Sequence, residues 1–467
     1  MSVAADSGRL TSRRRIGFDI GRLFSGEMAN KVLRFAATVV LARVLSPSQF
    51  GLVNVGVSIS GIVMIACSLG LADLGAREVA VNPSQAGWLL GHITTVRLAA
   101  VTLLSALGLL VAAFTWTGHT ILLAAAAAMA IFMSVSGDWL GRGLGRMTLV
   151  ASAVAMGGVG LIVGSVAVVV FHGGANGAMA SFALGEAATL AVLWVGLHRR
   201  LQVSFGLAGT GALLRRARPL ALSALAIYSY YANLDTIILA ASRSEAAAGL
   251  YSAPYRLFLM FNVVGIFAAY AMLPVLSRLV EADALEQALH LVRSIVGLLA
   301  IYGLVVLGLV EVVGSDLLAL FFGSRFRAAE ATFILLVSGV SWYVTGYPAG
   351  YSLIADGRNA GFLRGAAAAG LINVGLDFAL IPLMGMRGAG LATIVAFMVS
   401  AIVWLRERSV LARATIPMCG ALTAASVLAL LVAFLGLNAR VGGALTLGLA
   451  GALAANRFYA ARASVGG

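Results

Sequence analysis

Eight ionisable side chains stand inside long apolar runs of this 467-residue sequence, where an uncompensated charge is costly. Four are basic (Lys31, Arg34, Arg97, Arg256) and four are acidic (Glu27, Glu186, Asp235, Asp377). At the centre of a membrane-spanning helix, each such group costs at least about 2.5–3.5 kcal/mol on insertion scales, so it usually faces a wet cavity or a partner. The equal numbers allow complete pairing in a purely structural arrangement. The alternative is that some of these groups bind a ligand.

The first apolar run carries a polar stripe. On a helix, Glu27, Lys31, Arg34 and Thr38 fall within about 60° of one another. One interpretation is an i, i+4 pair between Glu27 and Lys31 near the membrane surface, with Arg34 extending to the headgroups. However, Arg34 lies about twelve residues into the run, too deep to reach the headgroups easily. This depth favours a cavity-lining position.

The four cations are candidates to bind a phosphate group. Arginine holds phosphate through two parallel hydrogen bonds and stays charged at any physiological pH. Lys31, Arg34, Arg97 and Arg256 come from three different apolar runs and could surround one anion. For Arg97, a simple ion pair with Glu186 is an equal alternative.

The carboxylates of the second half have polar neighbours on their own helices. Tyr228, Tyr231 and Asp235 share one face of the run 219–240, within about 60°. Tyrosines beside a carboxylate suit sugar hydroxyls or a coupling cation, and a buried Tyr–Asp hydrogen bond is the structural alternative. Asn373 and Asp377 are four residues apart and could join Asp235 in a proton or sodium site. Pairing of Asp377 with a neighbouring helix is the other interpretation.

The composition excludes a soluble protein. Hydrophobic residues make up 61% of the chain and charged residues 11%, with 55 glycines. Soluble domains are about 45–50% apolar, glycine included, and about 25% charged. The five histidines have no metal-ligand spacing, and Cys67 and Cys419 stand apart in apolar runs. A nucleotide-binding P-loop needs a lysine in Gly-x-x-x-x-Gly-Lys-Ser/Thr, but Lys31 is the single lysine and lies in GEMANKVL. We therefore expect a membrane protein that is not an enzyme and needs no metal or cofactor.

The apolar runs predict an all-α polytopic membrane protein with about fourteen spans, since about 20 apolar residues cross the hydrocarbon layer. The first run is too long and too charged for a cleaved signal peptide, so we count it as a span. The expected spans are 22–45, 50–72, 88–114, 119–137, 147–171, 176–197, 219–240, 249–273, 291–313, 329–355, 361–381, 387–405, 414–436 and 441–460.

The basic residues predict the orientation. The net charge is +14, and the arginines stand in short groups between apolar runs, which argues against a nucleic-acid-binding face. With an even number of spans, 22 basic residues fall on the side of the two termini and six on the other side. Both termini are therefore expected in the cytoplasm.

The sequence contains an internal repeat. Val39–Ile59 aligns without a gap with Ile237–Leu257 at a constant offset of 198, matching Ser46 with Ser244 among other identities. Such parallel repeats recur in secondary transporters. We expect a basic cytoplasmic tail, two six-helix bundles separated by a cytoplasmic linker, and two additional helices with a cytoplasmic tail; the corresponding ranges are 1–21, 22–198, 199–218, 219–405 and 406–467.

Three segments resemble a known family. LARVLSPSQFGLVNVGVSI with LGLADLGAREVA resembles the first two spans of polysaccharide and oligosaccharide (Wzx-type) flippases. AGLYSAPYRLFLMFNVV is similar to their seventh and eighth spans, and INVGLDFALIPLMGMRGAGLATIV to their eleventh and twelfth. This family belongs to the multidrug/oligosaccharidyl-lipid/polysaccharide (MOP) exporter superfamily. The resemblance implies two six-helix bundles around a central cavity, two C-terminal helices, and flipping of a lipid-linked glycan.

The sequence thus leads to a functional hypothesis with defined alternatives. We expect a transporter in the bacterial inner membrane that flips a lipid-linked oligosaccharide, a precursor of O-antigen or exopolysaccharide, by alternating access. A proton or sodium gradient would drive it, and glycan polymerase or export machinery would be its protein partners. A multidrug or cation antiporter of the same superfamily and a non-transporting scaffold for glycan assembly are the alternatives. No outer loop is long enough for the catalytic domain of a membrane polymerase or ligase.

Overall fold

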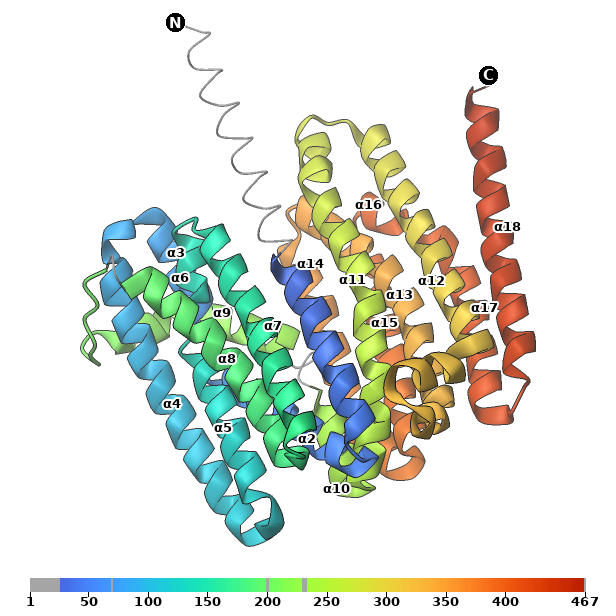
Figure 1. Cartoon of the computed structure of the whole chain (residues 1–467). Coiled ribbons are helices and arrows are strands. Elements are labelled where there is room, and N and C mark those ends of the chain that lie inside the picture. Colours follow the sequence, from blue (N-terminus) through green and yellow to red (C-terminus); the bar gives the residue numbers. More distant parts are fainter. Residues whose placement is uncertain (1–25, 69, 199–200, 229–232, 466–467) are drawn as a thin grey trace, which may run out of the picture. The chain divides into compact units, whose positions relative to one another are not determined.

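The computed structural model describes residues 26–68, 70–198, 201–228 and 233–465. Within these ranges all regular secondary structure is helical, with no strand. Figure 1 shows that most of the helices are long. This confirms the predicted all-α class. Eleven of the described helices are long and apolar enough to cross a membrane. The count of fourteen spans stays a prediction.

The chain divides into two compact units between Leu225 and Ala226. The first unit holds a helix over residues 26–44, α2 (Pro47–Ser68), α3 (Leu71–Val81), α4 (Ala86–Thr115), α5 (Thr120–Ser134), α6 (Asp138–Gly143), α7 (Met147–Val170), α8 (Gly174–His198) and most of α9 (Thr210–Tyr228). The second holds α10 (Leu234–Ser242), α11 (Glu245–Glu281), α12 (Leu285–Phe322), α13 (Glu330–Ala355), α14 (Asn359–Met384), α15 (Met386–Arg406), α16 (Val410–Arg413), α17 (Ile416–Leu435) and α18 (Ala439–Val465). The five predicted domain ranges stay a prediction.

Glycines bring α7 and α8 into close contact in the first unit. A Cβ atom added to Gly185 would lie 2.8 Å from the carbonyl oxygen of Gly157, and one added to Gly164 would lie 2.8 Å from Cβ of Ser181. In a membrane, where lipid is as apolar as the side chains, such close backbone contact is a main source of helix association. An adjacent face of α7 receives the first helix, since a Cβ at Gly158 would lie 2.9 Å from Cβ of Leu33.

Helix α13 forms the centre of the second unit. In its most apolar window, 83% of the residues are buried, as expected for a helix surrounded by others. It packs against α11, α12, α15 and α17. On the α17 side, Ser426 accepts hydrogen bonds from the Ser338 hydroxyl at 3.0 Å and the Trp342 indole at 2.9 Å. These bonds attach the C-terminal helix pair to the bundle.

The internal repeat appears in the local structure. The first helix ends at residue 44 and α2 begins at Pro47, while α10 ends at Ser242 and α11 begins at Glu245, which preserves the offset of the sequence repeat. The matched serines also play the same part, because each hydroxyl accepts a hydrogen bond from a backbone amide three residues later. The distances are 3.2 Å from Gln49 to Ser46 and 3.1 Å from Ala247 to Ser244. This is the usual N-cap arrangement.

The expected helix over 219–240 is wrong as a continuous element. Asn233 has a left-handed backbone (φ 47°), and α10 begins only at Leu234. A left-handed residue cannot continue a right-handed helix, and asparagine adopts this conformation more readily than most residues. The preceding helix, α9, already begins at Thr210, within the segment expected to be a linker. Residues 229–232 lie outside the described part of the chain.

The α7–α8 contact predicts an effect on stability. We expect Gly185→Leu to lower the unfolding temperature of the purified protein and to cost about 1–3 kcal/mol, because the added side chain must separate two backbones in contact. Gly108→Leu is the matched control, since a Cβ there meets nothing within 4 Å. Equal unfolding temperatures for the two variants in detergent would contradict this account of the packing.

Candidate functional site

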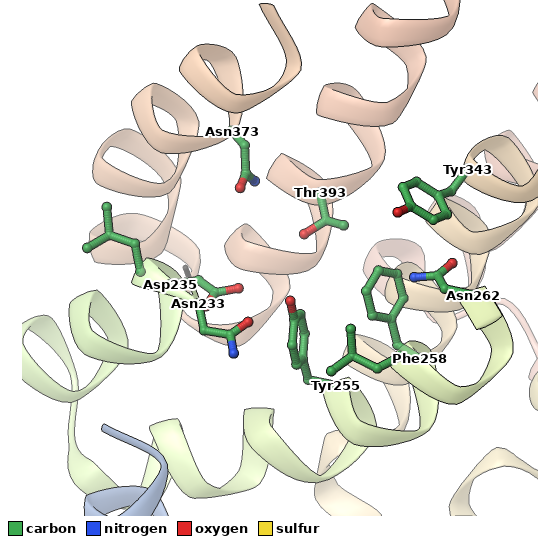
Figure 2. Close-up of a pocket in the computed structure, with 10 residues that line it drawn as sticks. Asn233, Asp235, Tyr255, Phe258, Asn262, Tyr343, Asn373 and Thr393 are labelled. Atoms are coloured by element: carbon green, nitrogen blue, oxygen red, sulfur yellow. The ribbon is translucent and has the colours of Figure 1, made fainter. Parts of the chain in front are cut away.

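A polar pocket lies within the second unit. It receives side chains from five helices: α10, α11, α13, α14 and α15. Figure 2 shows several of them directed toward a common space. The polar lining residues are Asn233, Asp235, Tyr255, Asn262, Tyr343, Asn373 and Thr393.

Asp235 is the anchored carboxylate of this pocket. It stands in the first turn of α10, where the positive end of the helix dipole favours an acidic group. Its Oδ1 accepts a 2.7 Å hydrogen bond from the Thr236 amide, and its Oδ2 accepts one from the Tyr251 hydroxyl of α11. Both oxygens therefore have donors, and the side chain is only 7% exposed.

Asp377 is the less satisfied carboxylate. It lies on α14, is 1% exposed, and its Oδ1 has no hydrogen-bond partner among the described residues. It interacts electrostatically with Asp235. Neither carboxylate forms an ion pair within the described part of the chain. Two acidic groups close together in a low-dielectric site cannot both stay ionised without a cation or a proton.

The structure brings together the three residues expected to form an ion site. Asn373 lines the pocket one turn before Asp377 on α14, and Asp235 enters from α10. Thr393 of α15 adds a hydroxyl that the sequence analysis missed, although it stands in the segment GLATIV that carried the family resemblance. Oxygen ligands of this kind suit a hard cation. The role of these residues as an ion site stays a prediction.

The tyrosine partner of Asp235 differs from the expected one. The predicted contacts with Tyr228 and Tyr231 required an unbroken helix, and Asn233 interrupts it. The Tyr228 side chain and Tyr231 lie outside the described residues. The observed donor is Tyr251, which a helical-wheel argument restricted to one helix could not find, because it reaches Asp235 from α11.

Aromatic rings complete the wall of the pocket. Tyr255 and Phe258 of α11 lie 5.2 Å apart between ring centroids, and Phe258 lies 6.1 Å from Phe397 of α15. The Tyr343 hydroxyl is 2.5 Å from that of Tyr347. Asn262 lines the same pocket and has a buried Oδ1 with no partner in the described chain. The pocket thus combines acidic, amide and aromatic groups.

In the first unit, the expected ion pairs are rearranged. Arg34 forms an ion pair with Glu186 of α8, so the predicted pair between Arg97 and Glu186 is wrong. The side chains of Arg34 and Glu186 are 29% and 15% exposed. No ion pair joins Glu27 to Lys31 in the described ranges, and Lys31 is exposed. A pair four residues apart competes with partners on other helices, and the i, i+4 spacing alone does not decide the outcome.

Arg97 and Arg256 occupy different surroundings. Arg97 is 4% exposed, its Nε has no hydrogen-bond partner among the described residues, and it interacts electrostatically with Asp138 and Asp73. Arg256 is half-buried on α11, next to the pocket residue Tyr255. That Lys31, Arg34, Arg97 and Arg256 surround one anion stays a prediction.

The fold is that of a known class of membrane transporters. The chain is similar to the structure of the lipid II flippase MurJ in an inward closed conformation, with a TM-score of 0.67 and 13% identity over 94% of this chain and 99% of MurJ. It is also similar to an inward-facing multidrug resistance MATE family transporter of the MOP superfamily, with a TM-score of 0.63 and 17% identity over 86% and 98% of the two chains. At these low sequence identities, the structural similarity establishes the fold of this chain.

Residues 17–280 match the family model described as "Polysaccharide biosynthesis protein". The chain belongs to this family. It is also 31% identical over 184 residues to the probable flippase AglR of Haloferax volcanii; the match covers 38% of this chain and 37% of AglR. These findings confirm the family resemblance, and the similar proteins are named as flippases and transporters rather than enzymes.

The Arg34–Glu186 pair predicts a charge-swap result. We expect Arg34→Glu and Glu186→Arg each to destabilise the protein by about 3 kcal/mol or more, because each places like charges together in a partly buried site. Combining the two substitutions should recover most of the loss by restoring an ion pair. Thermal unfolding in detergent measures this, and a double variant as unstable as the single ones would show that the pair does not hold the first helix to α8.

Proposed function

We propose that this protein flips a lipid-linked oligosaccharide across the bacterial inner membrane by alternating access, with both termini in the cytoplasm. The observation that carries the proposal is the family match over residues 17–280. The names of AglR and MurJ as flippases add to it. The surplus of basic residues on the side of the termini supports the orientation. Glycan polymerase or export machinery would receive the product.

The basic residues would bind the phosphate of the lipid carrier. Arg34 already binds an anionic group, the Glu186 carboxylate, and its guanidinium could bind a phosphate through the same kind of charge-assisted hydrogen bonds. Arg256 would contribute from the second unit, and Lys31 and Arg97 would add positive potential. The sugars would contact polar and aromatic side chains.

A proton or sodium ion bound by Asp235, Asn373 and Asp377 would couple the gradient to flipping. Asp235, Asn373 and Thr393 line one pocket, and Asp377 interacts electrostatically with Asp235. Neither carboxylate has a described cationic partner, so a bound cation would neutralise the pair. Binding to one conformation more tightly than to another is what lets an ion gradient drive a transport cycle.

A reconstituted assay tests the flippase proposal. In liposomes with a fluorescent lipid-linked oligosaccharide, we expect the wild type to move label between leaflets. Arg34→Ala and Arg256→Ala should slow flipping by about tenfold or more, equivalent to about 1.4 kcal/mol each. Arg278→Ala, an exposed position on the same helix as Arg256, is the matched control. No flipping by the wild type would overturn the function, and undiminished flipping in both variants would overturn the phosphate contacts.

The coupling site is tested by ion-dependent stability. A ligand that binds only the folded state stabilises it, by about 2.7 kcal/mol at a hundredfold excess over its dissociation constant. We expect added sodium, compared with choline, to raise the unfolding temperature of the wild type and of the exposed-site control Asp316→Asn. Asp235→Asn and Asp377→Asn should abolish the rise. If sodium has no effect, a pH gradient must drive flipping in liposomes; failure of both gradients would contradict the proposal.

Multidrug or cation antiport is the second candidate, and the acidic, aromatic pocket is the observation that favours it. Organic cations bind well between carboxylates and aromatic faces, and Asp235, Tyr255, Phe258 and Tyr343 provide both. Cation-dependent efflux of a fluorescent drug without flipping of the glycolipid would select this function. Absence of both activities would leave the non-transporting scaffold.

A further inference from the structure

One more carboxyl group, outside the polar pocket, is fully enclosed by helices of the second unit. Glu311 lies on α12 and is 0% exposed. Its Oε2 accepts a 2.7 Å hydrogen bond from the Thr446 hydroxyl of α18, which is also fully buried. Its Oε1 is buried with no hydrogen-bond partner among the described residues. The carboxyl is therefore only half satisfied.

Glycines make the surroundings of Glu311 tight and dry. A Cβ on Gly443 would lie 2.6 Å from the carbonyl oxygen of Gly308, so α12 and α18 touch through their backbones. On the side of the orphaned oxygen, a Cβ on Gly442 would lie 3.7 Å from Oε1 and 2.7 Å from Val432 Cγ2 of α17. Helices α12, α17 and α18 thus enclose the group with backbone and apolar atoms.

Within the described part of the chain, no cation compensates this carboxyl. Its one polar contact there is Thr446, and none of the described titratable side chains of α11, α13, α16, α17, α18 or the turn 324–329 faces it. Charged groups on α12 and on the elements around it interact elsewhere: Arg457 with the Arg293 carbonyl, Arg327 with Asp316, and Glu330 with the Ser315 amide. An ionised carboxylate buried in this way costs several kcal/mol or more.

We propose that Glu311 is a proton-binding site that holds α18 against α12. Oε1 takes a proton from water to form the neutral acid, and Oε2 keeps the Thr446 hydrogen bond. A metal cation would need several oxygen ligands, whereas Glu311 and Thr446 supply three side-chain oxygens between valine and glycine. Loss of the proton leaves an uncompensated charge between α12 and α18. As a result, α18 separates from α12 or water enters between the two helices.

Infrared spectroscopy tests the bound proton. The wild type in lipid nanodiscs at neutral pH should show the carbonyl band of a protonated carboxylic acid that Glu311→Gln lacks. Asp316→Asn, at an exposed carboxylate on the same helix, should retain the band. Should Glu311→Gln fail to accumulate, Thr446→Val replaces it, and the band should move to higher frequency as its hydrogen bond is lost. A spectrum unchanged by the substitution overturns the proposal.

Hydrogen–deuterium exchange tests the helix contact. After correction for the intrinsic pH dependence of exchange, alkaline pH should raise exchange in residues 439–450 of the wild type by about tenfold, which equals about 1.4 kcal/mol of lost protection. Glu311→Gln, which stays neutral, should show no such rise, while Asp316→Asn should behave as the wild type. Equal responses in all three proteins, or no response in the wild type, would contradict the inference. Neither experiment depends on what the protein transports.

Discussion

The dominant constraint on this structure is the cost of placing a charge in an apolar layer. Each ionisable group that the helices carry into the hydrocarbon must find a counterion, a hydrogen bond, a proton or a ligand. Arg34 and Glu186 compensate each other, and Asp235 receives two donors. Asp377, Glu311 and Arg97 retain a buried atom without a partner among the described residues. Groups whose compensation is incomplete are therefore the first candidates for function.

Helix packing sets how dry these groups are, and glycine controls the packing. Where two glycines face each other, as at Gly308 and Gly443, the backbones touch and no space remains for water. The polar pocket is built differently, because its rim consists of asparagine, threonine and tyrosine side chains from five helices. The same fold therefore contains an enclosed carboxyl at Glu311 and an open polar space beside Asp235.

Sequence periodicity predicted the positions of most helices, because each position depends on one segment or on the repeat. The role of Asp235, Asn373 and Asp377 as an ion site stays a prediction. The sequence repeat relates the junction between the first helix and α2 to the junction between α10 and α11. Ser46 caps α2, and the matched Ser244 caps α11. Sequence periodicity could not identify interaction partners on other helices. Spacing within a helix shows on which face Glu186 lies but not which other helix that face contacts. The sequence therefore offered Arg97 as its ion-pair partner, whereas the observed partner is Arg34. Glu311 was missed because it stands near the end of an expected span.

The two units bury charged side chains of opposite sign. Among the described residues, Arg97 is the buried charged side chain of the first unit, while those of the second are Asp235, Glu311 and Asp377. A unit with surplus buried acids gains stability from binding protons or cations, whereas one with a surplus cation favours anions. Under the proposed function, energy coupling by a cation would belong to the second unit on electrostatic grounds. Arg34 and Arg97 of the first unit would then provide the positive charge that an anionic substrate needs.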